Sequence, residues 1–309
     1  MINIIGKRYW YFLLSALIIV PGLVSLLLPG GLLLGIDFTG GTLWEIQFNH
    51  QVEPAIVRSV FTDQGLDATV QTSGQNTVTI RTKEIRADSP QKNELAQAIK
   101  DRPGLGDFTE LEFNAVGPAI GSEIAQRAIV AVALASIGIL IYIWLAFRRL
   151  PNAFRFGACA IAALVHDAFV VLGTFSILGR LFGVEMDSMF VTAILTVIGF
   201  SVHDTIVVFD RIRENALRHP GEPFEIIVNH SLLPTLGRSI STSLTVVFTI
   251  AALVLFGGVT TRIFALTLLI GIISGTYSSI FNASPLLVVW ENGEVGKLFR
   301  KLRPAPAAG

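Results

Sequence analysis

Residues 189–213, with the sequence MFVTAILTVIGFSVHDTIVVFDRIR, combine an apolar run with an imidazole, a carboxylate and a basic end. The run from 189 to 209 is long enough to cross a bilayer, because a helix rises about 1.5 Å per residue and the hydrocarbon layer is about 30 Å thick. His203 and Asp204 lie inside this run. Ionisable groups within a membrane span are costly and commonly handle ions or protons. The stretch therefore predicts a membrane helix with a role in transport.

The composition is that of an integral membrane protein. Hydrophobic residues make up 52% of the 309 residues, 15% are charged, and the mean hydropathy is +0.63, whereas soluble domains are about 25% charged. The formal net charge of zero argues against a nucleic-acid partner, which would need a basic surface. Cys159 is the single cysteine; it cannot form a disulfide within the chain, and we expect a small buried thiol.

Six apolar stretches have the length of a membrane span, and they lie at about 9–29, 125–147, 153–178, 187–209, 238–257 and 262–290. The last is longer than a span needs, so we expect it to end before Pro285 or to tilt. The first follows Lys7 and Arg8 but is too long for a signal peptide and lacks an A-x-A cleavage site. We interpret it as an uncleaved anchor.

The distribution of Lys and Arg sets the expected orientation. These residues gather at the N-terminus, in the second and fourth loops and in the tail, whereas the opposite short loops hold only Arg180 and Arg262. Basic short loops stay cytoplasmic. We therefore expect a multi-pass membrane protein with both termini in the cytoplasm. The predicted parts are an N-terminus with the first span (1–34), an external domain (35–124), a five-helix membrane region (125–292) and a basic cytoplasmic tail (293–309).

The external domain has the pattern of a small α+β fold. Strands are predicted at 42–49, 67–72, 77–81 and 108–116, with helices at 53–64 and 90–101. This βαββαβ order is that of a ferredoxin-like sandwich. The domain has no His/Cys cluster, phosphate-binding loop or nucleophile elbow. We therefore expect a mechanical or binding module, no cofactor and no enzymatic activity.

A short sequence that occurs twice in the chain contains a second ionisable pair. The sequence VHDAFVV at 165–171 recurs as VHDTIVV at 202–208, so that two successive spans each carry a His-Asp pair. For His166 and Asp167, a role in ion handling and a role in holding helices together both stay open. A zinc site that combines both pairs is disfavoured, because His-Asp neighbours on a helix point about 100° apart and there is no H-E-x-x-H motif.

Arg238 begins the fifth span on the side where the fourth span ends, so Asp204 and Arg238 are expected at similar depth and could form an ion pair. Helical spacing gives two polar stripes, which we expect to face each other along a hydrated path; their members are Arg238, Ser241, Thr242, Thr245 and Thr249 on one span and Thr192, Thr196, Gly199 and His203 on the other. Protonation of Asp204 would weaken the pair and free a helix to move. The alternatives are that Arg238 reaches lipid headgroups and that Asp204 is a structural hydrogen-bond partner.

A face of small residues on the sixth span indicates tight helix packing, and its members are Thr267, Gly271, Ser274, Ser278 and Asn282. Glycine-containing segments, GIDFTGGT at 35–42 and VGPAIGSE at 116–123, lie where the chain leaves and re-enters the membrane. Glycines allow tight turns and close packing. We expect structural joints that also transmit domain motion, and their candidate residues are Asp37, Phe38, Gly40, Gly41, Gly117, Gly121 and Glu123.

These two segments, together with VHDTIVVFDRIREN at 202–215 and RSISTSLT at 238–245, closely resemble SecF, the smaller half of the bacterial SecDF protein-export membrane complex. The resemblance runs from the first span to the sixth, and the wider relatives are the resistance-nodulation-division transporters. It implies that Asp204 and Arg238 take part in proton conduction. SecF proteins often have Asn before this aspartate, where this chain has His203.

The resemblance also implies partners and an energy source. The partners would be a SecD-like subunit, the SecYEG channel, the exported unfolded polypeptide and membrane lipid. The proton-motive force would promote late steps of polypeptide export across the cytoplasmic membrane, with H+ as the expected coupling ion and Na+ as the alternative. One rival function is a stand-alone or homo-oligomeric proton-driven exporter of a small molecule or lipid. Others are an assembly scaffold that uses no ion gradient and, more remotely, an intramembrane enzyme.

Overall fold

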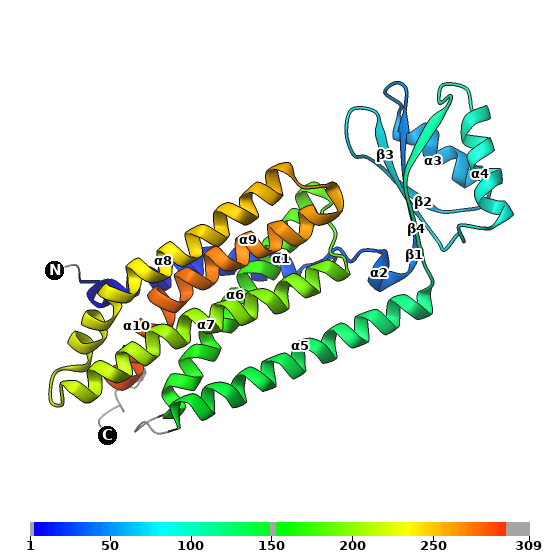
Figure 1. Ribbon diagram of the computed structural model, residues 1–309. Coiled ribbons are helices and arrows are strands. Elements are labelled where there is room, and N and C mark those ends of the chain that lie inside the picture. Colours follow the sequence, from blue (N-terminus) through cyan, green and yellow to red (C-terminus); the bar gives the residue numbers. More distant parts are fainter. Residues whose placement is uncertain (1–2, 149–152, 295–309) are drawn as a thin grey trace, which may run out of the picture. The chain divides into compact units, whose positions relative to one another are not determined.

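The computed structural model describes residues 3–148 and 153–294, and the chain divides into two compact units (Figure 1). The helical unit comprises residues 1–33 and 131–309, and the α/β unit comprises residues 34–130. The predicted boundaries of the external domain were 35 and 124. The predicted basic tail lies outside the described residues from position 295 onward.

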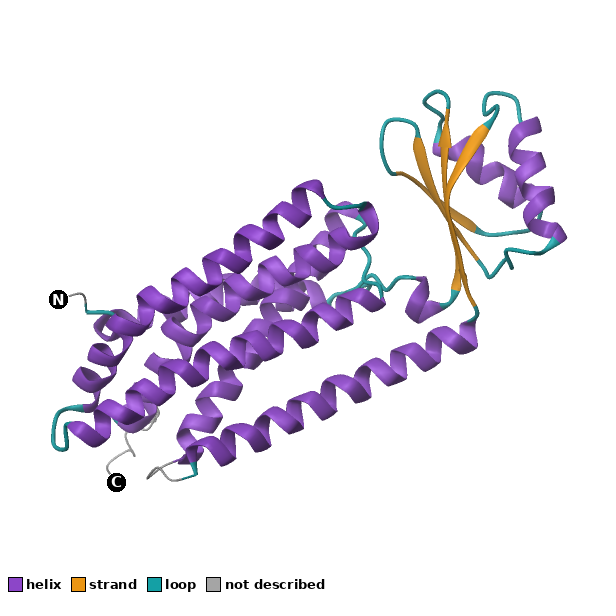
Figure 2. Ribbon diagram, in the orientation of Figure 1, coloured by secondary structure: helices purple, strands orange, loops and turns teal. Residues whose placement is uncertain are grey.

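The described chain contains six helical segments that are long and apolar enough to cross a membrane, which confirms the predicted number. They are formed by α1 (Arg8–Leu27), α5 (Pro118–Phe147), α6 (Ala153–Phe182), α7 (Ser188–Arg218), α8 (Phe224–Phe256) and α9 (Val259–Ser278) with its continuation (Figure 2). A short 3-10 helix, η1 (Ile5–Lys7), precedes α1.

Two helices begin earlier than the hydropathy pattern predicted. The start of α5 is at Pro118, where the missing N–H of proline is tolerated, rather than at 125. The start of α8 is at Phe224 rather than at 238. Polar residues and Pro234 interrupt the apolar sequence before Arg238, but this segment still forms helix and buries Ile227, Val228 and Leu232.

The last span does not end before Pro285. After α9 the helix widens into a π-helical turn, η2 (Ser279–Ala283), and continues as α10 (Ser284–Glu291). Pro285 lies in the first turn of α10, where no backbone N–H is needed. Ser284 Oγ donates to the carbonyl of Ser279 at 3.1 Å and satisfies an acceptor within the wider turn. The span therefore passes through the proline.

The helical unit is organised around α9, which packs against α6, α7 and α8, while α1 packs against α6. Apolar side chains from these helices form two buried clusters, one including Phe156, Phe209 and Leu287 and the other including Phe175 and Phe190. Among the described side chains of α5, Ile143 is the one large apolar residue that is fully buried. The bundle core therefore depends little on α5.

The α/β unit contains α2 (Ile36–Thr39), β1 (Gly41–Phe48), α3 (Pro54–Asp63), β2 (Ala68–Thr72), β3 (Thr77–Thr82), α4 (Pro90–Asp101) and β4 (Phe108–Val116). The four strands pair antiparallel in the order β2-β3-β1-β4. Both long helices, α3 and α4, cover one face of the sheet (Figure 2) and bury Phe61, Leu95 and Ile99 against Trp44 and Ile80. The α+β prediction is confirmed, and the arrangement fits the predicted ferredoxin-like sandwich.

Candidate functional site in the helical unit

Asp167 of α6 lies at the centre of a buried cluster of hydroxyl groups. Ser201 of α7 donates to Oδ2 at 2.5 Å, Ser278 donates to the same oxygen at 2.7 Å, and Ser274 donates to Oδ1 at 2.7 Å. His166 Nδ1 lies 3.0 Å from Oδ1. We call Asp167 and these three serines the hydroxyl cage. Asp167 is 1% exposed, and an ionised carboxylate only accepts hydrogen bonds, so the four neighbours fill its acceptor positions.

Small residues allow α9 to approach α7 closely at the cage. A β-carbon added to Gly275 of α9 would lie 3.0 Å from the Cβ of Ser201, and one added to Gly271 would lie 2.2 Å from a methyl carbon of Val197. The predicted small-residue face of the sixth span therefore does pack tightly. Two of its members, Ser274 and Ser278, also supply hydrogen bonds to Asp167.

The polar network extends from the cage to the π-helical turn. The Thr205 and Ser279 hydroxyls lie 2.8 Å apart, where one donates to the other, and they lie 3.1 and 3.3 Å from the carbonyl oxygen of Ser201. Further along the turn, Asn282 Nδ2 donates to Ser15 of α1 at 2.8 Å. π-Helical turns are rare and occur frequently at functional sites. The network thus joins α1, α6, α7 and η2 through side chains inside the bundle.

Asp204 has a different environment from Asp167. It is 5% exposed, and its Oδ2 atom has no hydrogen-bond partner in the described part of the chain. Arg238 of α8 is exposed, and no ion pair joins it to Asp204 in residues 3–148 and 153–294. The ion pair that we expected within this chain is therefore not formed in the structure. The reason is the rotation of α8, whose buried face carries Thr235, Ser239 and Ser243.

The two predicted polar stripes lie on the surface of this chain and do not line a path enclosed by it. On α8 the exposed members are Arg238, Ser241, Thr242, Thr245 and Thr249, and on α7 they are Thr192, Thr196, Gly199 and His203. Several threonines bond to the carbonyl one turn back on their own helix, as Thr196 does to Thr192 at 2.9 Å. We call these nine residues the polar face. Polar and charged groups in membrane spans are rarely left facing lipid.

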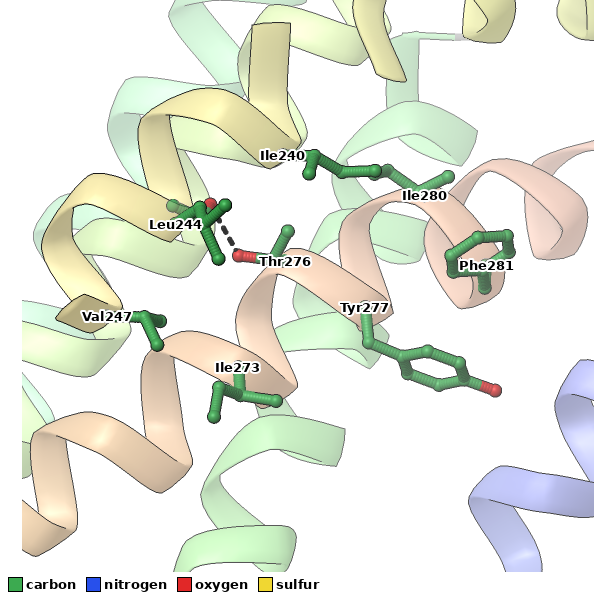
Figure 3. A pocket seen from close by; sticks show the side chains of 9 residues that line it. Ile240, Leu244, Val247, Ile273, Thr276, Tyr277, Ile280 and Phe281 are labelled. Atoms are coloured by element: carbon green, nitrogen blue, oxygen red, sulfur yellow. Dashed lines mark hydrogen bonds between the residues drawn. The ribbon is translucent and has the colours of Figure 1, made fainter. Parts of the chain in front are cut away.

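An apolar cavity of about 380 Å³ lies between α8 and α9. Figure 3 shows its lining, in which Thr276 donates to Ser243 at 2.7 Å beside Ile240, Leu244 and Tyr277. No charged side chain lines this cavity. Its chemistry therefore suits hydrocarbon and does not suit an ion.

The two glycine-containing joints meet within the α/β unit. Gly40 has φ +71°, and a β-carbon there would lie 2.7 Å from the Cα of Pro118. A β-carbon on Gly121 would lie 2.8 Å from the backbone nitrogen of Gly40 and 3.1 Å from the carbonyl oxygen of Phe38. The sequence does not indicate that the two joints meet, whereas the structure places the start of α5 directly against α2.

The other joint residues have less specific surroundings. Asp37 lies in the first turn of α2, and Gly41, with φ +123°, starts β1. A β-carbon on Gly117 would contact the Glu84 carboxylate at 3.4 Å. Glu123 pairs with Arg127 one turn later at an exposed position.

The hydroxyl groups around Asp167 were not predicted from the sequence. The available signal was the spacing of Ser274 and Ser278, four residues apart on an apolar helix, but it does not indicate what the hydroxyls contact. No group of three or more His, Cys, Asp or Glu residues suited to a metal ion occurs in the ranges that the structure describes.

Comparison with known proteins identifies the family. A family model described as Protein export membrane protein SecD/SecF, C-terminal, matches residues 97–293. The chain is 57% identical to Protein translocase subunit SecF of Thermobaculum terrenum over the full length of both chains. It is 47% identical to the SecF subunit of Anaerolinea thermophila, covering 99% of this chain and 100% of that one.

Solved structures are similar over nearly the whole chain. The crystal structure of SecDF, a translocon-associated membrane protein from Thermus thermophilus, superposes with a TM-score of 0.80 at 32% identity, and the match covers 94% of this chain. A crystal structure of SecDF in a super-membrane-facing form gives a TM-score of 0.64 over 97% of this chain, again at 32% identity. This chain spans 39% and 40% of the lengths of those two SecDF chains.

Proposed function

Because this chain belongs to the SecF family of protein-export membrane proteins, we propose that it is the SecF-like subunit of the accessory complex of the Sec translocase. In this role it uses the proton-motive force to promote late steps of polypeptide export across the bacterial cytoplasmic membrane. Both termini lie in the cytoplasm, and the α/β unit lies on the opposite side. Its partners are a SecD-like subunit, the SecYEG channel and the exported unfolded polypeptide.

The observation that carries this proposal is the contrast between Asp167 and Asp204. The first carboxyl has four hydrogen-bonding neighbours, whereas the second is buried with one oxygen unpaired. A buried polar atom without a partner costs about 1–3 kcal/mol. A proton or a small cation that binds at Asp204 removes that cost. Asp204 is therefore the ion-binding group, and Asp167 holds the helices around it.

The polar face supports a partner within the membrane. His203 and Arg238 are exposed on membrane-spanning helices of this chain, where contact with hydrocarbon is unfavourable. A SecD-like subunit that covers the polar face would place its own polar groups against them and close a hydrated path next to Asp204. The long SecDF chains that resemble this one are consistent with such a partner.

An ion gradient supplies enough energy for movement of the α/β unit. One charge that crosses the membrane releases about 2.3 kcal/mol per 100 mV. A few ions per cycle can therefore shift a unit between two states that differ by a few kcal/mol. Occupation and release of Asp204 change the interactions of α7, and the helices attached to α7 carry this change toward the α/β unit.

The test uses proteoliposomes that contain this chain, its SecD-like partner and the SecYEG channel, with an imposed proton or sodium gradient. Export of a preprotein should be stimulated by the gradient in the unsubstituted complex and lose this stimulation in Asp204→Asn. Asp210→Asn is the matched control, because Asp210 lies on the same helix, is exposed and pairs with Arg213. Co-purification checks that each complex assembles.

Full gradient-dependent stimulation in Asp204→Asn would contradict the proposal. Stimulation by a sodium gradient alone would identify Na+ as the coupling ion. Purification of the chain as a homo-oligomer without a SecD-like partner, together with gradient-driven movement of a small molecule or lipid, would instead establish the exporter function.

A further inference from the structure

We propose that α1 and α6 move as one rigid pair, and that Arg180 is a positioning residue that fixes the end of α1 to α6. Through this pair a change at the hydroxyl cage on α6 reaches the segment that leads into the α/β unit. The inference deepens the proposed function and rests on it for its role in coupling, although the rigidity of the pair can be measured independently.

The first observation is direct backbone contact between the two helices. A β-carbon added to Gly173 of α6 would lie 2.7 Å from the Cα of Gly22 in α1, and the reverse addition gives the same distance. One turn further, the hydroxyls of Ser25 and Ser176 lie 2.7 Å apart. Ser176 also donates to the carbonyl of Gly31. Glycine contacts and hydroxyl hydrogen bonds of this kind hold membrane helices at close distance.

The second observation is the position of Arg180 at the end of α1. Its Nη2 donates to the carbonyls of Ser25, Leu28 and Pro29 at 2.9, 2.8 and 3.0 Å, and its Nε donates to Ser25 Oγ at 3.0 Å. The last carbonyls of a helix lack partners within the helix and carry partial negative charge. The guanidinium of Arg180 satisfies two of them, those of Ser25 and of the C-cap residue Leu28, and adds a favourable charge interaction. Arg180 thus caps a helix on which it does not itself lie.

The chain stays attached to this part of the bundle just beyond the cap. The carbonyl of Leu33 accepts a hydrogen bond from the backbone of Met186 at 2.9 Å, and Leu33 packs against Gly179. The α/β unit begins at the next residue, Leu34. The segment after α1 therefore stays in contact with α6, and with the loop after α6, as far as Leu33, the last residue before the α/β unit.

The same helix, α6, carries the hydroxyl cage at Asp167 and the cap at Arg180. These residues are separated by less than four turns of one continuous helix, or about 20 Å at about 1.5 Å per residue. A displacement of α6 at the cage therefore moves Arg180 and the end of α1 together. The other connection to the α/β unit is α5, whose part in the helical unit buries Ile143 alone among its described large apolar side chains. Of the two connections to the α/β unit, the one through α1 is therefore more tightly packed against the helical unit than the one through α5.

Rigidity can be measured with spin labels in the assembled complex. Leu27 at the end of α1 is 85% exposed and Leu181 near the end of α6 is 69% exposed, so labels at Leu27→Cys and Leu181→Cys should be tolerated in a Cys159→Ala background. We expect a narrow distance distribution that is unchanged when the gradient is applied and that broadens in Arg180→Gln. A broad distribution, or one that shifts with the gradient, overturns the inference whether or not export responds to the gradient.

A cross-link tests whether the pair acts as one body during export. Ser25→Cys with Ser176→Cys should form a disulfide when oxidised, because the hydroxyls are already in contact. We expect the oxidised complex to retain gradient-driven stimulation within about twofold of the reduced complex. Loss of stimulation on oxidation, restored on reduction, would show that the helices must move apart and would overturn the inference. It would leave the proposed function intact, because the reduced complex would still respond to the gradient.

Arg180 variants separate coupling from simple loss of structure. Arg180→Gln should retain gradient-driven ion uptake while export stimulation falls about fivefold or more, and Arg180→Lys should be intermediate because it keeps the charge but not the fork of donors. Arg262→Gln is the matched control, because Arg262 is exposed and contacts no described residue through a hydrogen bond or ion pair. Unchanged export per ion in Arg180→Gln would contradict the role of Arg180.

Discussion

Gly22 of α1 and Gly173 of α6 approach so closely that each occupies the position where the other would carry a side chain. The nearest atoms to an added β-carbon are backbone atoms, which cannot rotate out of the way as the end of a long side chain can. Two helices that meet in this manner must separate, or shift along each other, to accept even a methyl group.

Gly173→Ala should therefore destabilise the helical unit by about 1–3 kcal/mol, the usual cost of overpacking. Gly138→Ala on α5 is the control, because no atom lies within 4 Å of its added β-carbon; it should be neutral or stabilising by up to about 1 kcal/mol, since alanine favours helix. Reversible unfolding of the purified chain in detergent measures both. Equal effects of the two substitutions would show that the crossing is not tightly packed.

Asp167→Asn should be destabilising by about 1–3 kcal/mol, although it nearly preserves the shape of the side chain. The carboxylate accepts from Ser201, Ser274 and Ser278, whereas the amide NH2 donates, so hydroxyl donors would face another donor. Ser201→Ala removes a single donor and should cost less. The same unfolding measurement compares the variants, and a nearly neutral Asp167→Asn would mean that the three serine hydroxyls do not depend on a carboxylate acceptor.

The sequence predicted the helices and strands well because hydrophobic periodicity and turn residues are local signals. The strand at Phe108–Val116 and the helix at Pro90–Asp101 have the predicted bounds. Local signals failed where polar residues and a proline interrupt an apolar sequence that still forms part of a long helix. The first turns of α8 were missed for this reason, although they bury Ile227 and Leu232.

The candidate site was less predictable than the fold because it depends on helix rotation and on distant partners. The residue spacing predicted a polar stripe through Arg238 and Thr245. It did not show whether this stripe faces α7 or lies on the surface of the chain. Asp167 was identified as an unusual residue, yet two of its hydroxyl partners lie 107 and 111 positions away in the sequence. A single sequence contains no signal for such pairings.

The end of the described chain is attached to the start of α1 through Glu294. Its carboxylate accepts hydrogen bonds from Tyr9 at 2.7 Å and Arg8 at 2.6 Å, and Asn292 donates at 3.2 Å. Burial alone would raise the pKa of Glu294, but the hydrogen bonds from Tyr9, Arg8 and Asn292 and the Arg8 charge outweigh it and hold the pKa below its ordinary value.

A carboxyl whose pKa is lower in the folded state stabilises the protein above its ordinary pKa of about 4.3, and the contribution is lost as pH falls through the lower, folded value. Glu294→Gln should therefore cost about 1–3 kcal/mol at pH 7, and the difference from the unsubstituted protein should shrink between about pH 5 and pH 3. The free energy of unfolding, measured for both proteins over this pH range, checks this prediction, and Glu222→Gln at an exposed position is the control. If the difference in the free energy of unfolding does not change with pH, the contribution of Glu294 does not depend on its charge.

The polar face yields a prediction about assembly. Thr245 is exposed on α8 and bonds only to its own helix through Thr242, at 2.7 Å, so Thr245→Leu should leave the stability of the isolated chain within about 0.5 kcal/mol. If a SecD-like partner covers this face, a bulky side chain there should prevent close helix packing and weaken the complex about tenfold, which corresponds to about 1.4 kcal/mol. Thr245→Ser keeps the hydroxyl and small size and should assemble normally. Quantitative co-purification and unfolding of the isolated chain distinguish these effects, and normal assembly of Thr245→Leu would place the partner on another face.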